Sequence, residues 1–212
     1  WNKGVHSFGD MTNISKETRA HLEAHYVINH IEVDSIQKSN DGTIKNAVKL
    51  HDGFIVESVL IPTKKRTTAC VSSQVGCSLD CKFCATSRLK RMRNLNPDEI
   101  YDQVVAIDRQ SRVYKGHKLN NIVFMGMGEP LANLTNLTKA HEVITGHWGF
   151  NIGARSVTVS TSGLAPQIRK LAEFPAPIRL AISLHGATDE VRDLIMPINK
   201  KYPIKELFDA LH

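Results

Sequence analysis

The stretch GCSLDCKFCAT, residues 76–86, places three cysteines within eight residues. Their spacing is Cys-x3-Cys-x2-Cys, formed by Cys77, Cys81 and Cys84. Zinc sites normally use four protein ligands, often as two Cys-x2-Cys pairs, and only one such pair is present here. Soft thiolates also suit iron–sulfur clusters. Three thiolates on a cubane cluster leave one iron open, so the spacing favours a cluster whose fourth ligand comes from outside the protein.

The composition is that of a globular protein with a core of its own. The 212 residues are 42% hydrophobic and 23% charged, which is ordinary for soluble domains. All four cysteines lie between residues 70 and 84, whereas a disulfide scaffold would spread them along the chain. We therefore expect metal or redox chemistry in the cytoplasm, and no apolar run predicts a membrane span. Because the chain starts with Trp1 and ends in a helical pattern without a stop signal, we expect a fragment cut at both ends.

Residues 30–62 show the pattern of a small antiparallel sheet. The stretches SNDG (39–42) and HDG (51–53) are hairpin turn signals between alternating apolar residues. Alternation places Glu57 on an otherwise apolar strand face, with Ile55 and Val59. A carboxylate buried on such a face has a raised pKa and suits a general base. The alternative is a solvent-facing glutamate on an edge strand.

From residue 63 onward, strands alternate with helices. The candidate strands are TTACVSS, NIVFM, RSVTVST and IRLAISLH, and the first helix, NLNPDEIYDQVVAID, begins with a capping box of Asn96 and Glu99. A later helix capped by Thr188 should point Val191 and Ile195 inward. This alternation predicts βαβ units and a parallel sheet. A doubly wound sheet and an incomplete barrel share the pattern, and in both the ligands bind at the carboxyl ends of the strands.

Polar or glycine-rich loops follow all four predicted strands, which predicts a single shared site. They are the cysteine loop, GMGEP (126–130), STSG (160–163) and SLHG (183–186). GMGEP lacks the third glycine of a dinucleotide fingerprint, so a Rossmann interpretation is weak. Glycine there would let a ligand approach the backbone closely, and a plain tight turn is the alternative.

The cysteine spacing, with Phe83 before the last cysteine, resembles that of the radical S-adenosylmethionine (SAM) superfamily, in which SAM chelates the open iron of a 4Fe–4S cluster and is cleaved on reduction. Longer stretches are similar to the bacterial dual-specificity adenine-C2 methyltransferases of 23S rRNA and tRNA: CVSSQVGC, KRMRNL, MGMGEPL, VTVSTSG, LAISLHG and MPINKKYPI. The resemblance covers nearly the whole chain. It implies an α/β fold in which a β-rich accessory segment, residues 1–62, precedes a partial (β/α)6 barrel, residues 63–212, that is incomplete at its C-terminal end.

The resemblance also implies residue roles. Cys77, Cys81 and Cys84 would bind the cluster, and Cys70 matches the family's resolving cysteine, which forms a disulfide during turnover. Glu57 matches the proton acceptor. The residues of the SAM site would be Gly128, Glu129, Ser160, Ser183, Leu184 and His185.

The chemistry explains why these groups are needed. Carbon 2 of adenine is not nucleophilic, so the family carries the methyl group on a cysteine and forms a covalent RNA–protein adduct. A base must then remove the ring proton, and a second thiol must release the product. The chain has no fifth cysteine to carry the methyl group. We therefore expect it to hold the cluster and much of SAM without completing methyl transfer.

The partners expected from charge and resemblance are 23S rRNA and tRNA, with the target adenine outside its stack. The net charge is +6, and two basic runs suit RNA phosphates unless they are merely solvated loops: KKR (64–66) and SRLKRMR, with Arg88, Lys90, Arg91 and Arg93. We also expect a reductant such as flavodoxin and a monomeric protein.

Three alternatives stay open, namely a carbon-8 adenine methyltransferase, a non-catalytic RNA-binding fragment and a zinc module. The proline of GMGEP favours the carbon-2 enzyme over the carbon-8 enzyme. Six histidines show no ligand spacing and are expected on the surface or in helices: His6, His25, His51, His117, His141 and His147.

Overall fold

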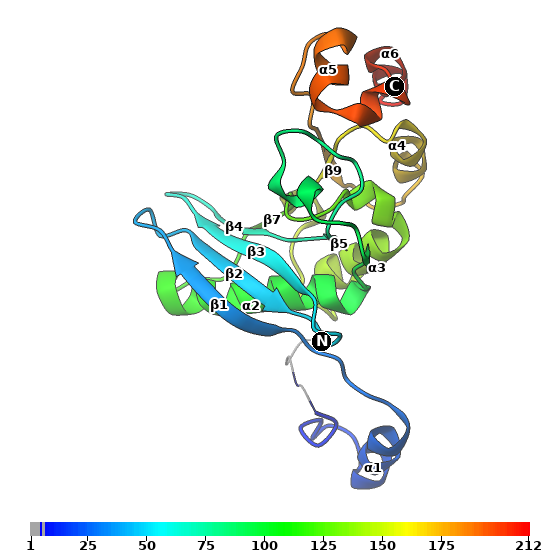
Figure 1. Cartoon of the computed structure of the whole chain (residues 1–212). Coiled ribbons are helices and arrows are strands. Elements are labelled where there is room, and N and C mark those ends of the chain that lie inside the picture. Colours follow the sequence, from blue (N-terminus) through cyan, green and yellow to red (C-terminus); the bar gives the residue numbers. More distant parts are fainter. Residues whose placement is uncertain (1–4, 6) are drawn as a thin grey trace.

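A seven-stranded mixed sheet runs through the computed structural model, which describes residue 5 and residues 7–212 (Figure 1). The sheet order is β1-β2-β3-β4-β7-β8-β9, with β1 Glu32–Lys38, β2 Ile44–Lys49, β3 Ile55–Pro62, β4 Thr67–Cys70, β7 Asn121–Phe124, β8 Val157–Thr161 and β9 Arg179–Ile182. A second, two-stranded sheet pairs β5 Gln74–Val75 with β6 Arg93–Asn94. The helices are α1 Lys16–His25, α2 Pro97–Lys115, α3 Leu134–Thr145, α4 Ala165–Ala172, α5 Asp189–Ile195 and α6 Ile204–Asp209. No helix in the described part of the chain is both long and apolar enough to cross a bilayer.

The four strands β4, β7, β8 and β9 pair in parallel and in chain order, which confirms the predicted parallel sheet. Each is followed by a helix, in the order α2, α3, α4 and α5. A doubly wound sheet reverses its strand order at a switch point. Here each new strand joins the same edge, which is the order of a (β/α) barrel. The sequence is compatible with a doubly wound sheet or an incomplete barrel, and the structure therefore has the incomplete barrel.

The predicted antiparallel strands are also present, and they extend the same sheet. β1, β2 and β3 form two hairpins whose turns contain Gly42 and Gly53, each at φ 85°. β3 then pairs antiparallel with β4, so hydrogen bonds join the accessory strands to the core. α1 lies apart from the sheet and has no buried residue (Figure 1). Residues 1–4 and His6, at the start of the accessory segment, lie outside the described residues.

One face of β3 is buried against α2, and it is not the face that carries Glu57. Val56 and Leu60 are fully buried on the α2 side, where Asn46 of β2 exchanges hydrogen bonds with Gln110 of α2. Glu57, on the other face, is exposed. Of the two interpretations that the sequence leaves open for Glu57, the structure therefore shows the solvent-facing glutamate. β3 carries apolar residues on both faces, so its alternation does not decide which one is buried, and the packing of α2 does.

Arg93 anchors the start of α2, where the predicted capping box of Asn96 and Glu99 is present. Its guanidinium donates two hydrogen bonds of 2.7 Å to the Glu99 carboxylate and one of 2.6 Å, from Nε, to Asp52. This network ties the β2–β3 turn to the helix. Arg93 was assigned to RNA phosphates from the sequence, but its donors are used within the protein.

His141 is a buried histidine whose ring has no hydrogen-bond partner among the described residues. It lies in α3, edge-on to the ring of Phe174, with the ring centroids 5.6 Å apart. Burial lowers the pKa of His141 to about 4. In an unfolded chain the pKa of histidine is about 6.5, so between these values the unfolded state binds more protons. The free energy of unfolding therefore decreases as the pH falls from about 6.5 to about 4.

We predict that His141→Leu removes this acid sensitivity. The shift corresponds to about 3 kcal/mol of stability lost by the wild type on acidification. Urea midpoints at pH 7 and pH 4.5 should differ more for the wild type than for His141→Leu. The exposed His147→Leu serves as the control and should behave as the wild type. Equal pH dependence in wild type and His141→Leu would contradict the prediction.

Candidate functional site

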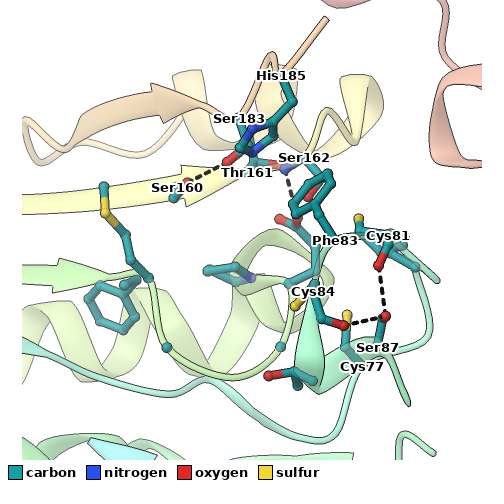
Figure 2. Close-up of a pocket in the computed structure, with 18 residues that line it drawn as sticks. Cys77, Cys81, Phe83, Cys84, Ser87, Ser160, Thr161, Ser162, Ser183 and His185 are labelled. Atoms are coloured by element: carbon teal, nitrogen blue, oxygen red, sulfur yellow. Dashed lines mark hydrogen bonds between the residues drawn. The ribbon is translucent and has the colours of Figure 1, made fainter. Parts of the chain in front are cut away.

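The loops after the parallel strands line one pocket, as their positions in the sequence predicted (Figure 2). The cysteine loop forms one side, and the loops after β7, β8 and β9 form the rest. The lining residues that matter below are Cys77, Cys81, Phe83, Cys84, Met125, Gly126, Gly128, Glu129, Ser160, Thr161, Ser162, Ser183 and His185.

The cysteine loop is held in shape by its own hydrogen bonds. The Ser87 hydroxyl lies 2.8 Å from the carbonyl oxygen of Cys81 and 2.6 Å from that of Cys84, and donates to them (Figure 2). The backbone N–H of Lys82 donates to the carbonyl of Ile195 over 2.8 Å, which attaches the loop to the end of α5. Protein contacts therefore fix the positions of the cysteines.

The three cysteines of this loop are free thiols that share the pocket. Burial raises the pKa of the Cys77 and Cys81 thiols, and the thiols are close enough for their charges to interact. In the described part of the chain, no three Cys, His, Asp or Glu side chains converge on a single-ion site. Soft thiolates such as these can hold an iron–sulfur cluster.

The loop after β7 brings Gly128 and Glu129 into the pocket. Gly128 has φ 96°, and a Cβ there would lie 2.5 Å from Cβ of Gln74, so the position requires glycine. The buried Glu129 carboxylate accepts hydrogen bonds from the backbone N–H groups of Leu131 at 3.1 Å and Ser162 at 2.8 Å. Burial raises the pKa of Glu129. This side chain thus links the loops after β7 and β8 and presents a carboxyl group that a bound cation would stabilise in its charged form.

Three of the four predicted SAM-site residues from β8 and the loop after β9 line the pocket. The hydroxyl oxygens of Ser160 and Ser183 lie 3.1 Å apart. His185 has a left-handed backbone, φ 54°, and its ring centroid lies 4.4 Å from that of Phe83. Leu184 is not among the lining residues. Its side chain packs against the core, and its carbonyl accepts a hydrogen bond from Arg192.

Glu57 and Cys70 lie outside the pocket lining, on neighbouring strands of the open sheet face. Val59 pairs with Cys70, and therefore Cys70 and Glu57 face the same side. Cys70 is buried, which raises the pKa of its thiol, whereas Glu57 Oε1 lies 3.0 Å from Nζ of Lys45 in an exposed ion pair. All four cysteines are free, so the disulfide implied for Cys70 is not present in this structure.

Two residues that support the site were missed in the sequence. The Ser72 hydroxyl donates to the carbonyl of Glu57 and accepts from the N–H of Met127 at 2.9 Å, which joins β3 to the loop after β7. Arg192 is fully buried in α5, while Val191, predicted inward, is exposed. Helical spacing places Arg192 on one face with Thr188 and Ile195, but arginine is rarely buried, so this spacing does not by itself indicate a buried Arg192.

Comparison with known proteins decides the family, because the sequence profile of the Radical SAM superfamily matches residues 71–212. The chain belongs to the radical SAM superfamily. The cofactors of this superfamily are a 4Fe–4S cluster and SAM, and the three free thiols and the buried Glu129 carboxylate of the pocket suit them.

The similar proteins are methyltransferases. The chain is 62% identical over 211 residues to the probable dual-specificity RNA methyltransferase RlmN of Flavobacterium johnsoniae and 65% identical to that of Christiangramia forsetii. Each alignment covers 100% of this chain and 60% of the relative. A crystal structure of a radical SAM methyltransferase from Sphaerobacter thermophilus matches with a TM-score of 0.91 and 40% identity, over 99% of this chain and 62% of that one. The chain thus spans about 60% of the length of these curated relatives.

We predict that Gly128→Ala weakens SAM binding at least about tenfold, equivalent to about 1.4 kcal/mol, because the new methyl group collides with Gln74. The matched control is Gly53→Ala, which has φ 85° but no atom within 4 Å of the added methyl. It imposes backbone strain without a collision and lies in a hairpin turn. Calorimetric titration of the cluster-loaded protein with SAM measures both variants. Unchanged affinity in Gly128→Ala would contradict the assignment of this loop to SAM.

Proposed function

We propose that this chain is the cluster- and SAM-binding part of an enzyme that methylates carbon 2 of adenine in 23S rRNA and tRNA through a methyl-cysteine intermediate. The observation that carries the proposal is the gathering of three free thiols, Gly128 and Glu129 at one rim, beside the sheet face that bears the buried Cys70 and the exposed Glu57. The names of the similar proteins from Flavobacterium johnsoniae and Christiangramia forsetii support it.

The pocket residues bind and orient the cofactors. A cluster held by Cys77, Cys81 and Cys84 would supply the electron that cleaves SAM. Glu129 offers a buried carboxylate to the ammonium group of SAM, and the cation offsets the cost of keeping that carboxylate charged. The hydroxyl groups of Ser160 and Ser183 offer further hydrogen bonds to the same ligand.

Glu57 and Cys70 serve the later steps in this proposal. Glu57 accepts the proton from the ring carbon, and its ion pair with Lys45 orients the carboxylate on the open face. Both partners of that pair are about half exposed, so the pair contributes at most about 1 kcal/mol and opens readily for a substrate. Cys70 supplies the thiol that releases the product: its sulfur would form a disulfide with the methyl-carrying cysteine while the bond between that cysteine and the methyl carbon on adenine breaks. The methyl-carrying cysteine is not one of the four cysteines of this chain. The raised pKa of Cys70 keeps its thiol protonated until a base acts on it.

RNA phosphates would meet the turn between β3 and β4. Lys64, Lys65 and Arg66 are exposed there, and no carboxylate pairs with them in the described part of the chain. The turn follows the strand that carries Glu57, so phosphates bound there would flank a base on the open face. The clustered free thiols support a cytoplasmic setting. A monomeric enzyme and a reductant such as flavodoxin complete the proposal.

The basic turn between β3 and β4 predicts how strongly RNA binding depends on salt. Replacing Lys64, Lys65 and Arg66 with alanine should reduce the slope of log K against log salt by about 2, because each phosphate contact to a single strand contributes about 0.7. Fluorescence anisotropy with a labelled adenine-containing single-stranded RNA measures the slope. Lys139→Ala, which removes one exposed cation in α3, is the control for a positive charge lost away from the turn and should leave the slope nearly unchanged. A triple variant with the wild-type slope would place the RNA elsewhere.

The proposed activity is tested in two stages. The anaerobically reconstituted chain should release 5′-deoxyadenosine from SAM when reduced, whereas Cys81→Ala should not, because it lacks one cluster ligand. No 5′-deoxyadenosine from wild type with an intact cluster would contradict the radical SAM assignment. Zinc without iron or sulfide would support the zinc alternative.

The second stage identifies the modified atom. Mass spectrometry of adenosines from cells with and without the full gene should find 2-methyladenosine that depends on the gene. A gene-dependent 8-methyladenosine would instead support the carbon-8 enzyme.

A further inference from the structure

We propose that Arg192 is the positioning residue of the SAM site, and that its buried charge also raises the reduction potential of the cluster. The inference rests on the proposed function, since it concerns how the same pocket is shaped. It goes further by giving one residue two separable effects, one through its hydrogen bonds and one through its charge.

The geometry of Arg192 joins the ends of two strands. Its Nη1 donates to the carbonyl oxygens of Ser183, at 3.2 Å, and Leu184, and its Nη2 donates to the carbonyl oxygen of Ser162 at 3.0 Å. Its Nε donates to Oδ1 of Asn199 at 2.8 Å. One planar guanidinium therefore holds the chain just after β8 and just after β9.

These carbonyls belong to the walls of the pocket. The N–H of Ser162 donates to the Glu129 carboxylate, so fixing Ser162 also fixes the acceptor for the SAM ammonium. Ser183 and His185 flank the carbonyl of Leu184, and both line the pocket. Arg192 thus holds the loops after β8 and β9 directly, and through Ser162 it also holds Glu129 in the loop after β7. It does this without lining the pocket itself.

Burying this arginine is costly, and packing alone does not explain it. Arg192 is 0% exposed, and in the described part of the chain no carboxylate forms a salt bridge with it. Its four hydrogen-bond acceptors are neutral, and one of them, Asn199, in turn donates to the carboxylates of Asp189 at 2.9 Å and Asp193 at 2.8 Å. Asp189 also interacts electrostatically with the guanidinium without a salt bridge. A buried cation without a direct partner is destabilising unless its hydrogen bonds are complete. A fork of donors that fits three carbonyls is specific to arginine, and lysine does not reproduce it.

The charge of Arg192 also lies near the cluster loop. α5 ends at Ile195, whose carbonyl binds the N–H of Lys82, next to Cys81. The guanidinium and the Cys81 thiolate are close enough to interact electrostatically. Reduction of a cluster adds one negative charge, and a nearby buried cation stabilises the reduced form more than the oxidised form. Removing the cation should therefore lower the potential.

The test compares Arg192→Lys, which keeps the charge but loses the fork, with Arg192→Gln, which loses both. Arg112→Gln, which removes an exposed charge from α2, is the control. In the reconstituted chain we expect both Arg192 variants to bind SAM at least about tenfold more weakly by calorimetric titration. We expect the midpoint potential, followed by EPR, to fall in Arg192→Gln and to stay near the wild-type value in Arg192→Lys. A purely structural role would not separate the two variants in this way.

Hydrogen exchange in the cluster-free chain gives a readout that needs neither cofactor. The amides of Ser183, Leu184 and Gly186 are hydrogen-bonded within this region and should exchange faster in both Arg192 variants, while those of α2 should not. Unchanged exchange, or unchanged SAM affinity in folded variants, would overturn the positioning role. Equal potentials in Arg192→Lys and Arg192→Gln would overturn the charge effect. If wild type itself binds no SAM, the proposed function fails, and the exchange measurement still decides whether Arg192 fixes these loops.

Discussion

Parallel hydrogen bonding between β4, β7, β8 and β9 is the constraint on which the site depends. Parallel strands added in chain order end at the same rim, so four loops that are far apart in sequence meet there. The cysteine loop contributes thiols, the loop after β7 contributes a buried carboxylate, and β8 and the loop after β9 contribute hydroxyls and an imidazole. A different strand order would leave each loop sequence unchanged but would move the side chains of these loops apart.

Buried polar side chains hold these loops to one another. Gln103 of α2 accepts from the N–H of Ser72 at 2.8 Å and donates to its carbonyl at 3.2 Å, and Ser72 in turn bonds to Glu57 and Met127. Gln74 accepts from the N–H of Glu129 at 2.9 Å. Such groups are costly to bury unless all their bonds are made, and when made they define a single arrangement. These buried hydrogen bonds therefore hold the loops of the pocket in one arrangement.

The sequence predicted the features that depend on local spacing and strand order. The cysteine loop, the capping box at Asn96 and the hairpin turns are local, and alternation of strand and helix predicted the parallel sheet. The sequence left the exposure of Glu57 open because β3 is apolar on both faces, and only the position of α2 decides which face is covered. Arg192 was missed for a related reason, since three of its four hydrogen-bond acceptors are backbone carbonyls, and a sequence does not show which carbonyls a side chain reaches. Contacts across the fold, rather than propensities, decide such positions.

The continuous sheet limits how far Glu57 and Cys70 can move relative to each other. Their strands, β3 and β4, share a ladder of hydrogen bonds, with Val59 directly opposite Cys70. The backbones of β3 and β4 are therefore held at a fixed spacing, while the exposed Glu57 side chain keeps its rotamer freedom. In the proposed reaction the two groups would act at different moments from this shared backbone support, so a change in their separation would come from rotation of the Glu57 side chain.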